Sequence, residues 1–192
     1  MKDFKIKLFD YFADKHKIVR WQNESKHTEG YKQIKKYIIS DFEEANDLDS
    51  FLLELEDDEI SADKVRHTYI AETESGEAIG FLSLHRPLEH RKPGGNVYIE
   101  FLAINPKYQK QGYGSAILEE VFSNIEHYAL SKPETISTMF KRKNESSRRL
   151  FEKFGFIVAK EPLTFYYNAA IKMQDLENNI KQLKQASLPQ PE

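Results

Sequence analysis

Two runs of apolar residues in the middle of the chain predict a β-hairpin. The runs are His67–Ala71 and Ala78–His85, both short and rich in residues that favour strands. The segment between them, Glu72–Glu77, is polar and contains Gly76, which is typical of a turn.

A strand followed by a helix is predicted next along the chain. Tyr98–Ile104 is rich in β-branched and aromatic residues and stops at Asn105-Pro106, whereas Ser115–Tyr128 carries a helical repeat of apolar residues. Gly112 and Gly114 lie between these two elements. The glycines therefore lie where the strand becomes the helix.

A second strand and helix are predicted closer to the C-terminus. Thr135–Phe140 has a strand pattern, and a helix with one apolar face begins at about Glu145. That face is formed by Leu150, Phe151 and Phe154. Gly155 suits the C-terminal cap of this helix, and Phe156–Val158 starts another strand. Phe165–Met173 is the last predicted strand.

The N-terminal third has a less regular pattern. Lys17–Trp21 is one candidate for the first strand, and the alternation over Phe4–Leu8 is another; the pattern does not rank them. Gly30–Ile39 and Glu43–Leu55 are predicted helices. Arg86–Gly95 is rich in proline and glycine and is predicted to be a loop.

Composition favours one compact domain. The 192 residues are within the usual range of a single domain. Without cysteine there is no disulfide, thiolate nucleophile or Cys-ligated zinc, so a cytoplasmic location is expected. No apolar run approaches the roughly 18 residues of a membrane span, and a net charge of -3 argues against a nucleic-acid binder.

Negative charge is concentrated in one segment. Ten acidic residues and no basic residue lie between Asp41 and Glu59. One interpretation is a set of solvated helix faces and a loop. The other is a negative field that draws a cationic ligand toward the protein.

The loop from Gln109 to Gly114 has the pattern Q-x-x-G-x-G at a helix start. Consecutive backbone N–H groups there, with no Cβ in the way, suit a phosphate or diphosphate. The dinucleotide fingerprint does not fit, because Ile117 stands at its third glycine, and the Walker sequence is also missing.

Three segments together resemble the GNAT family, the Gcn5-related N-acetyltransferases. The Q-x-x-G-x-G loop resembles the family's acetyl-CoA loop, and Leu102–Pro106 resembles the phrase that precedes it. Asn144–Phe156 resembles the family's "N…A..LY.K.GF" segment. The resemblance covers roughly residues 60–174. It implies an α/β (α+β) fold with a mixed, mostly antiparallel sheet flanked by helices, in a domain over residues 1–174. Residues 175–192 are expected to be a polar C-terminal helix and tail.

The resemblance also implies a set of residues that bind acetyl-CoA. Backbone at the end of the strand would contact pantetheine and polarise the thioester carbonyl, and the loop would hold the diphosphate. The expected set is Leu102, Ala103, Ile104, Gln109, Lys110, Gln111, Gly112, Tyr113, Gly114, Ser115, Asn144 and Phe151. Asn144 would also serve as a helix N-cap. The basic residues of 141–149 either approach the phosphates or form a solvated helix end.

Catalysis of acetyl transfer to an amine requires a proton acceptor, because most aliphatic amines are protonated at neutral pH. Glu100 is the candidate base, on the same face as Ile104 if no bulge intervenes. A glutamate paired across the sheet is the structural alternative. Tyr98 would share the face of Glu100 and could replace it as a polar contact.

The main departure from the family pattern is Phe151, which stands where the family usually has the tyrosine that protonates the leaving thiolate. Ser147 and Tyr166, or Tyr167, are candidate substitutes, and water is another. A coenzyme A thiol with a pKa of roughly 8.5 is a tolerable leaving group without assistance.

The sequence thus predicts direct transfer of an acetyl group from acetyl-CoA to an amine acceptor, with no metal. The acceptor is a small molecule or a peptide, and the loop at 86–95 would form a rim of its site. A weakly catalytic acyl-CoA sensor and a transferase of longer acyl groups are the alternatives. We expect no nucleic-acid or membrane partner, and a homodimer is an open expectation.

Overall fold

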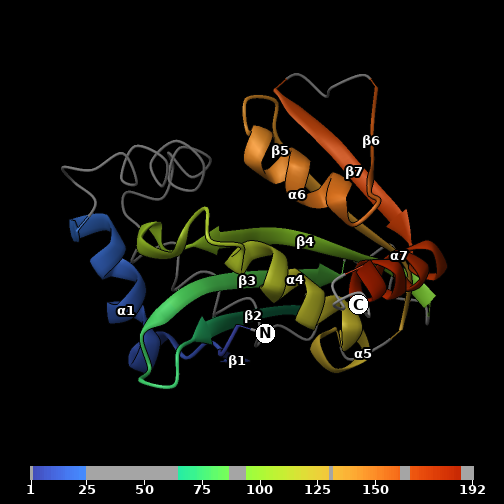
Figure 1. The fold of residues 1–192 in the computed structure, drawn as a ribbon. Coiled ribbons are helices and arrows are strands. Elements are labelled where there is room, and N and C mark those ends of the chain that lie inside the picture. Colours follow the sequence, from blue (N-terminus) through green and yellow to red (C-terminus); the bar gives the residue numbers. More distant parts are fainter. Residues whose placement is uncertain (1, 25–64, 87–93, 130–131, 161–164, 187–192) are drawn as a thin grey trace, which may run out of the picture.

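The computed structural model describes residues 2–24, 65–86, 94–129, 132–160 and 165–186. Seven strands in these ranges form one sheet in the order β1-β2-β3-β4-β5-β7-β6 (Figure 1). The strands are β1 (Lys5–Leu8), β2 (Val65–Glu72), β3 (Ala78–Arg86), β4 (Gly94–Ile104), β5 (Pro133–Lys141), β6 (Ile157–Val158) and β7 (Tyr166–Lys172). Among these strands only β4 and β5 pair in parallel.

The helices of the described ranges pack on this mostly antiparallel sheet (Figure 1). They are α1 (Tyr11–Glu24), α4 (Tyr113–Ser123), α5 (Ile125–Tyr128), α6 (Glu145–Lys153) and α7 (Met173–Ala186), with a 3-10 turn at Pro106–Tyr108. The predicted mixed sheet flanked by helices is thereby confirmed. The helix predicted over 115–128 is interrupted at Asn124, which separates α4 from α5.

The first strand of the protein is β1, so the alternation over Phe4–Leu8 identified it. The other candidate, Lys17–Trp21, was wrong, because these residues belong to α1. Asp14 and Ile18 are both fully buried and stand four residues apart, which is the spacing of one helix face. The predicted helices at 30–39 and 43–55, the acidic segment, and residues 87–93 of the predicted loop lie outside the described residues.

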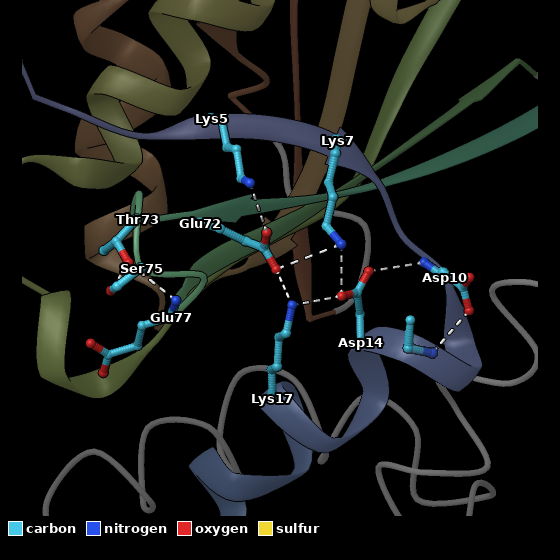
Figure 2. Close-up of polar contacts among 10 residues, drawn as sticks. Lys5, Lys7, Asp10, Asp14, Lys17, Glu72, Thr73, Ser75 and Glu77 are labelled. Carbon is cyan, nitrogen blue, oxygen red and sulfur yellow. Dashed lines mark hydrogen bonds and ion pairs between the residues drawn. The ribbon is translucent and has the colours of Figure 1, made fainter.

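A cluster of charged side chains fixes α1 to the edge of the sheet (Figure 2). Asp14 and Glu72 are buried, and Lys17 donates to both carboxylates, at 2.9 Å to Asp14. Lys7 of β1 also lies 2.9 Å from Asp14. Burial favours the neutral acid, but the hydrogen bonds from Lys17 and Lys7 outweigh it and lower the pKa of Asp14. The cluster therefore joins β1, α1 and β2 electrostatically.

The hydrophobic core lies between the sheet and the pair α4 and α7. Helices α4 and α7 each bury one apolar face in this core. These faces consist of Ile117, Leu118, Val121 and Phe122 in α4 and of Met173, Leu176 and Ile180 in α7. Gly155, after α6, has a φ of 87°, in the left-handed region, and a Cβ there would meet the side-chain amide of Asn179 in α7. A glycine is therefore required where α6 ends against α7.

Strands β4 and β5 diverge part of the way along their length (Figure 1). Their pairing runs from Gly94 opposite Pro133 to Ile99 opposite Thr138 and then ends, although β4 continues to Ile104. The Thr138 hydroxyl donates to the Ile99 carbonyl at 3.0 Å and closes the last pair. Beyond this point no strand of the described ranges pairs with the edge of β4 that faces β5.

A β-bulge at Glu100 changes which side chains of β4 share a face. On the β3 side, Ser83 pairs with Phe101 whereas Leu84 pairs with Ile99, so Glu100 is the extra residue. The simple alternation that would place Glu100 on the same face as Ile104 therefore does not apply. The bulge coincides with the point where β5 leaves β4.

No helix within the described ranges is long and apolar enough to cross a membrane.

Candidate active site

A cleft of about 400 Å³ opens where β4 and β5 diverge. Its lining comes from the end of β4, the loop before α4, the end of β5 and the first two turns of α6. The unpaired edge of β4 forms one wall and α6 forms the other. The cleft is thus built by the separation of two strands that are parallel neighbours farther back.

Almost all the residues expected to bind the cofactor line this one cleft. They are Leu102, Ala103, Ile104, Gln109, Lys110, Gly112, Tyr113, Gly114, Ser115, Asn144 and Phe151. Gln111 is the exception: it is exposed, and its side-chain amide donates to the Lys107 carbonyl at 2.7 Å. Residues more than 40 positions apart in the chain are therefore brought to one place.

The shape of the loop is fixed by side-chain amides that bind backbone. Asn105 is buried, donates to the Ala78 carbonyl at 2.9 Å and accepts from the N–H of Lys107 at 3.0 Å. Gln109 donates to the Ile104 carbonyl at 2.9 Å. The glutamine of the Q-x-x-G-x-G pattern thus has a structural role here, because it ties the loop to the end of β4.

Gly112 makes the turn into α4. Its φ of 83° lies in the left-handed region, and it caps the helix without a side-chain hydrogen bond. Lys110, two residues earlier, also has a positive φ of 58°. The N–H groups in the first turn of α4 have no intrahelical acceptors, so they can donate to an anion.

The α6 wall carries Asn144 and Phe151. The Asn144 side chain accepts from the N–H of Ser147 at 3.1 Å, so Asn144 is the N-cap of α6. Phe151 is 3% exposed, and its ring contacts two other phenylalanine rings. It is parallel to the ring of Phe140 and makes an interplanar angle of 61° with the ring of Phe156. This aromatic stack contains no proton donor.

Three of the four candidate catalytic residues lie close enough to interact electrostatically. Burial, together with the nearby Glu100 and Tyr166, raises the pKa of Tyr98 to about 12. Tyr98 therefore keeps its proton near neutral pH and can donate a hydrogen bond as a polar contact. Glu100 lines the cleft, and its Oε2 atom is shielded from solvent. Ser147 lines the cleft from α6.

Sequence reasoning missed several lining residues and one support of the loop. Thr138 and Met139 of β5, Tyr108, Ser146 and Leu150 also line the cleft. The Tyr108 hydroxyl and Lys107 ammonium both bind the carboxylate of Glu77, at 2.5 Å and 2.7 Å. No sequence signal marks Glu77, because this contact depends on how the β2–β3 hairpin lies beside the loop.

No group of three or more His, Asp or Glu side chains suited to a metal ion occurs in the part of the chain that the structure describes.

Comparisons with known families and structures show the family to which this chain belongs. Residues 21–156 match the model of the Acetyltransferase (GNAT) family, and this chain belongs to that family. It is therefore an acyltransferase of the N-acetyltransferase type, and acetyl-CoA is its cosubstrate. A search of curated proteins found no match.

Solved structures share the fold. A spermidine N-acetyltransferase from Vibrio cholerae, in complex with CoA and spermine, has a TM-score of 0.68 at 17% identity, over 92% of this chain and 99% of its own. An uncharacterized protein from Bacillus halodurans has a TM-score of 0.71 at 14% identity, over 96% and 92%. A putative acetyltransferase from Salmonella typhimurium, with its cofactor acetyl-CoA, has a TM-score of 0.61 at 19% identity, over 90% and 95%.

Proposed function

We propose that this protein transfers the acetyl group of acetyl-CoA directly to a primary amine. The cleft between the diverging strands carries this proposal, because it brings an unpaired strand edge, an anion-binding helix start and Glu100 together. The chain has no cysteine to form a thioester intermediate, which favours direct attack.

The donor would lie along β4 with its diphosphate at the start of α4. The amide groups of pantetheine resemble an added peptide strand, so the edge over Leu102–Ile104 offers them backbone partners. Backbone N–H groups of the same segment would stabilise the oxyanion that forms on the thioester carbonyl. The N–H groups of Gln111–Ser115 would receive the diphosphate.

Glu100 is the proposed base. It stands in the bulge at the point of strand divergence and lines the cleft, so its carboxylate can accept the amine proton directly or through one water molecule. The neutral amine then attacks the thioester carbon, and its nitrogen becomes positively charged. The nitrogen loses a second proton to water, and the tetrahedral intermediate collapses to the amide with loss of the coenzyme A thiolate. Tyr98, which stays protonated, would serve as a hydrogen-bond donor beside Glu100.

Protonation of the thiolate would come from water, from Ser147 or from Tyr166 or Tyr167, since Phe151 has no proton to give. Ser147 stands one helical turn before Phe151 and lines the same cleft. Because Phe151 replaces the usual tyrosine, a second function remains an alternative: a sensor that binds acetyl-CoA with little catalysis. Transfer of a longer acyl group is a further alternative.

The acceptor class we propose is a cationic amine, such as a polyamine, an aminoglycoside or a lysine side chain. The ten acidic residues between Asp41 and Glu59 support it through their negative field. The similar fold of the Vibrio cholerae spermidine N-acetyltransferase makes a polyamine the first compound to test. A cytoplasmic location and a homodimer also belong to this proposal.

The deciding experiment measures acetyl transfer to a panel of amines together with acetyl-CoA binding by calorimetry. We expect turnover with at least one cationic amine and weaker binding of acyl-CoA thioesters as the acyl chain lengthens. Tight acetyl-CoA binding without turnover on any amine would favour the sensor. Faster turnover with a longer acyl chain would favour a transferase of longer acyl groups.

A further inference from the structure

A lysine from α6 lies at the start of α4. The Nζ atom of Lys153 donates to the hydroxyl of Ser115 at 2.5 Å. Ser115 lies in the first turn of α4 and lines the cleft, whereas Lys153 is exposed at the C-terminal end of α6. A cation 38 residues away in sequence is thus held beside the N–H groups of the loop.

The start of α4 is an unfavourable place for a cation, whereas the last turn of α6, which carries Lys153, favours one. The N-terminal end of a helix carries a partial positive charge, which repels an ammonium group. Within the described residues, Lys153 has no carboxylate at ion-pair distance, and its hydrogen-bond partner is a neutral hydroxyl. An anion that binds between the ammonium group and the helix start would compensate both positive charges.

A second lysine reaches the same loop from the N-terminal end of the chain. The Nζ atom of Lys2 lies 4.2 Å from the ring centroid of Tyr113. Its Cε atom lies 3.6 Å from the place that a Cβ of Gly112 would occupy. Two lysines far apart in the chain, one near the N-terminus and one in α6, therefore adjoin the segment Gly112–Ser115.

We propose that Lys153 and Lys2 bind the diphosphate of coenzyme A. The inference rests on the donor position proposed above. It assigns to that position two charged ligands outside the Q-x-x-G-x-G loop: Lys153, which stands in the segment Asn144–Phe156, and Lys2, which stands outside the segments that carry the resemblance. The phosphate oxygens accept from the loop N–H groups and from the ammonium group of Lys153, which keeps or exchanges its bond to Ser115. Lys2 adds a second positive charge next to Tyr113. Affinity for the cofactor then has an electrostatic part supplied by residues far from the loop in sequence.

The test measures CoA binding by calorimetry without any acceptor amine. K153A should raise the Kd of CoA about three- to tenfold, as expected for an exposed charge-assisted contact, and K153R should restore most of it. K2A should raise the Kd by a smaller factor, and the double variant by more than either single one. K181A removes the same charge from the exposed face of α7 and should leave the Kd unchanged.

Two truncated cofactors locate the contact. Dephospho-CoA retains the diphosphate, so K153A should raise its Kd by the same factor as the Kd of CoA. S-acetyl-N-acetylcysteamine has no phosphate, so K153A should leave kcat/KM for this donor unchanged. An unchanged Kd of CoA in K153A, or a loss that disappears with dephospho-CoA, overturns the assignment of Lys153. A Kd of K2A equal to that of the native protein overturns the assignment of Lys2. Because binding is read without an acceptor, failure of the proposed transfer to amines would leave this result interpretable.

Discussion

The rings of Phe140 and Phe151 lie parallel, with centroids 6.2 Å apart and an interplanar angle of 1°. The contact joins β5 to α6 across the wall of the cleft. It places an apolar ring at the position where the resemblance implies a tyrosine. Residue 151 therefore packs the wall of the cleft and has no proton to give the leaving thiolate.

Replacing this ring tests how the thiolate leaves. If the thiolate departs with the help of water, Phe151→Tyr should change kcat by less than about tenfold, because a general acid then adds little to a leaving group with a pKa of roughly 8.5. Steady-state kinetics with the best amine would measure it. A gain of several orders of magnitude would mean that the native site is poorly adapted to transfer. Phe151→Leu, which loses the ring, is the control for packing.

Glu100→Gln tests the proposed base. The amide has nearly the same shape but cannot take the amine proton, so kcat/KM should fall by about 10² to 10⁴. The Kd of acetyl-CoA, measured by calorimetry, should stay the same. Tyr98→Phe is the matched control: Tyr98 keeps its proton, so the loss should be below about tenfold. Comparable kcat/KM values for E100Q and the native protein would rule Glu100 out as the base.

Gly112→Glu tests the anion site at the start of α4. A carboxylate at this position would repel the diphosphate, and most of the cofactor affinity should be lost. Gly112→Ala is the control, because it shares the strain of a side chain at a φ of 83°, at a cost of about 1 kcal/mol, without the charge. Calorimetry gives the affinity and thermal unfolding gives the stability. If G112E bound acetyl-CoA as tightly as G112A, the loop would not hold the phosphates.

Asp14→Ala tests the charged cluster between α1 and the sheet. The change leaves Lys7 and Lys17 with Glu72 alone, so the free energy of unfolding should fall by about 3 kcal/mol, at the low end for a broken buried pair. Urea unfolding near neutral pH would measure it. Asp10→Ala, which removes the N-terminal cap of α1 but leaves the cluster, should cost about 1 kcal/mol.

The same cluster predicts a dependence on pH with opposite signs at the two ends. The pKa of Asp14 is lowered on folding, so its contribution is complete above the unfolded value of about 3.9 and is lost as the pH falls through the folded value. Burial opposes the charge of Lys17, but the hydrogen bonds to Asp14 and Glu72 outweigh it and raise its pKa. The contribution of Lys17 is complete below about 10.4 and is lost as the pH rises through the folded value. The stability difference between the native protein and D14A should therefore shrink at both extremes.

Local patterns in the chain were sufficient for much of the fold. Strand β4 and helix α4, with Gly112 between them, follow from residue types that act over a few positions. The same holds for the cap at Gly155, because a backbone at positive φ needs glycine wherever the rest of the chain lies. These local signals carried the family resemblance and, with it, the residues that line the cleft.

Other features depended on contacts between distant segments. The pairing of β3 with β4 put the bulge at Glu100 and so changed its face, because side chains of a strand alternate with a period of two. The burial of Asp14 depends on the packing of α1 against the sheet edge, where Asp14 binds Lys7 and shares Lys17 with Glu72.

The sequence by itself determined the glycine turns and the strand and helix on either side of the Gln109–Gly114 loop, because each depends on backbone conformation within one short segment. Only the tertiary structure decided the position of Glu100, the burial of the charged cluster and the placement of Lys153 on Ser115. Each of these requires the register of a strand pair or the packing of one element on another, and neither is encoded in the spacing of residues along a single segment.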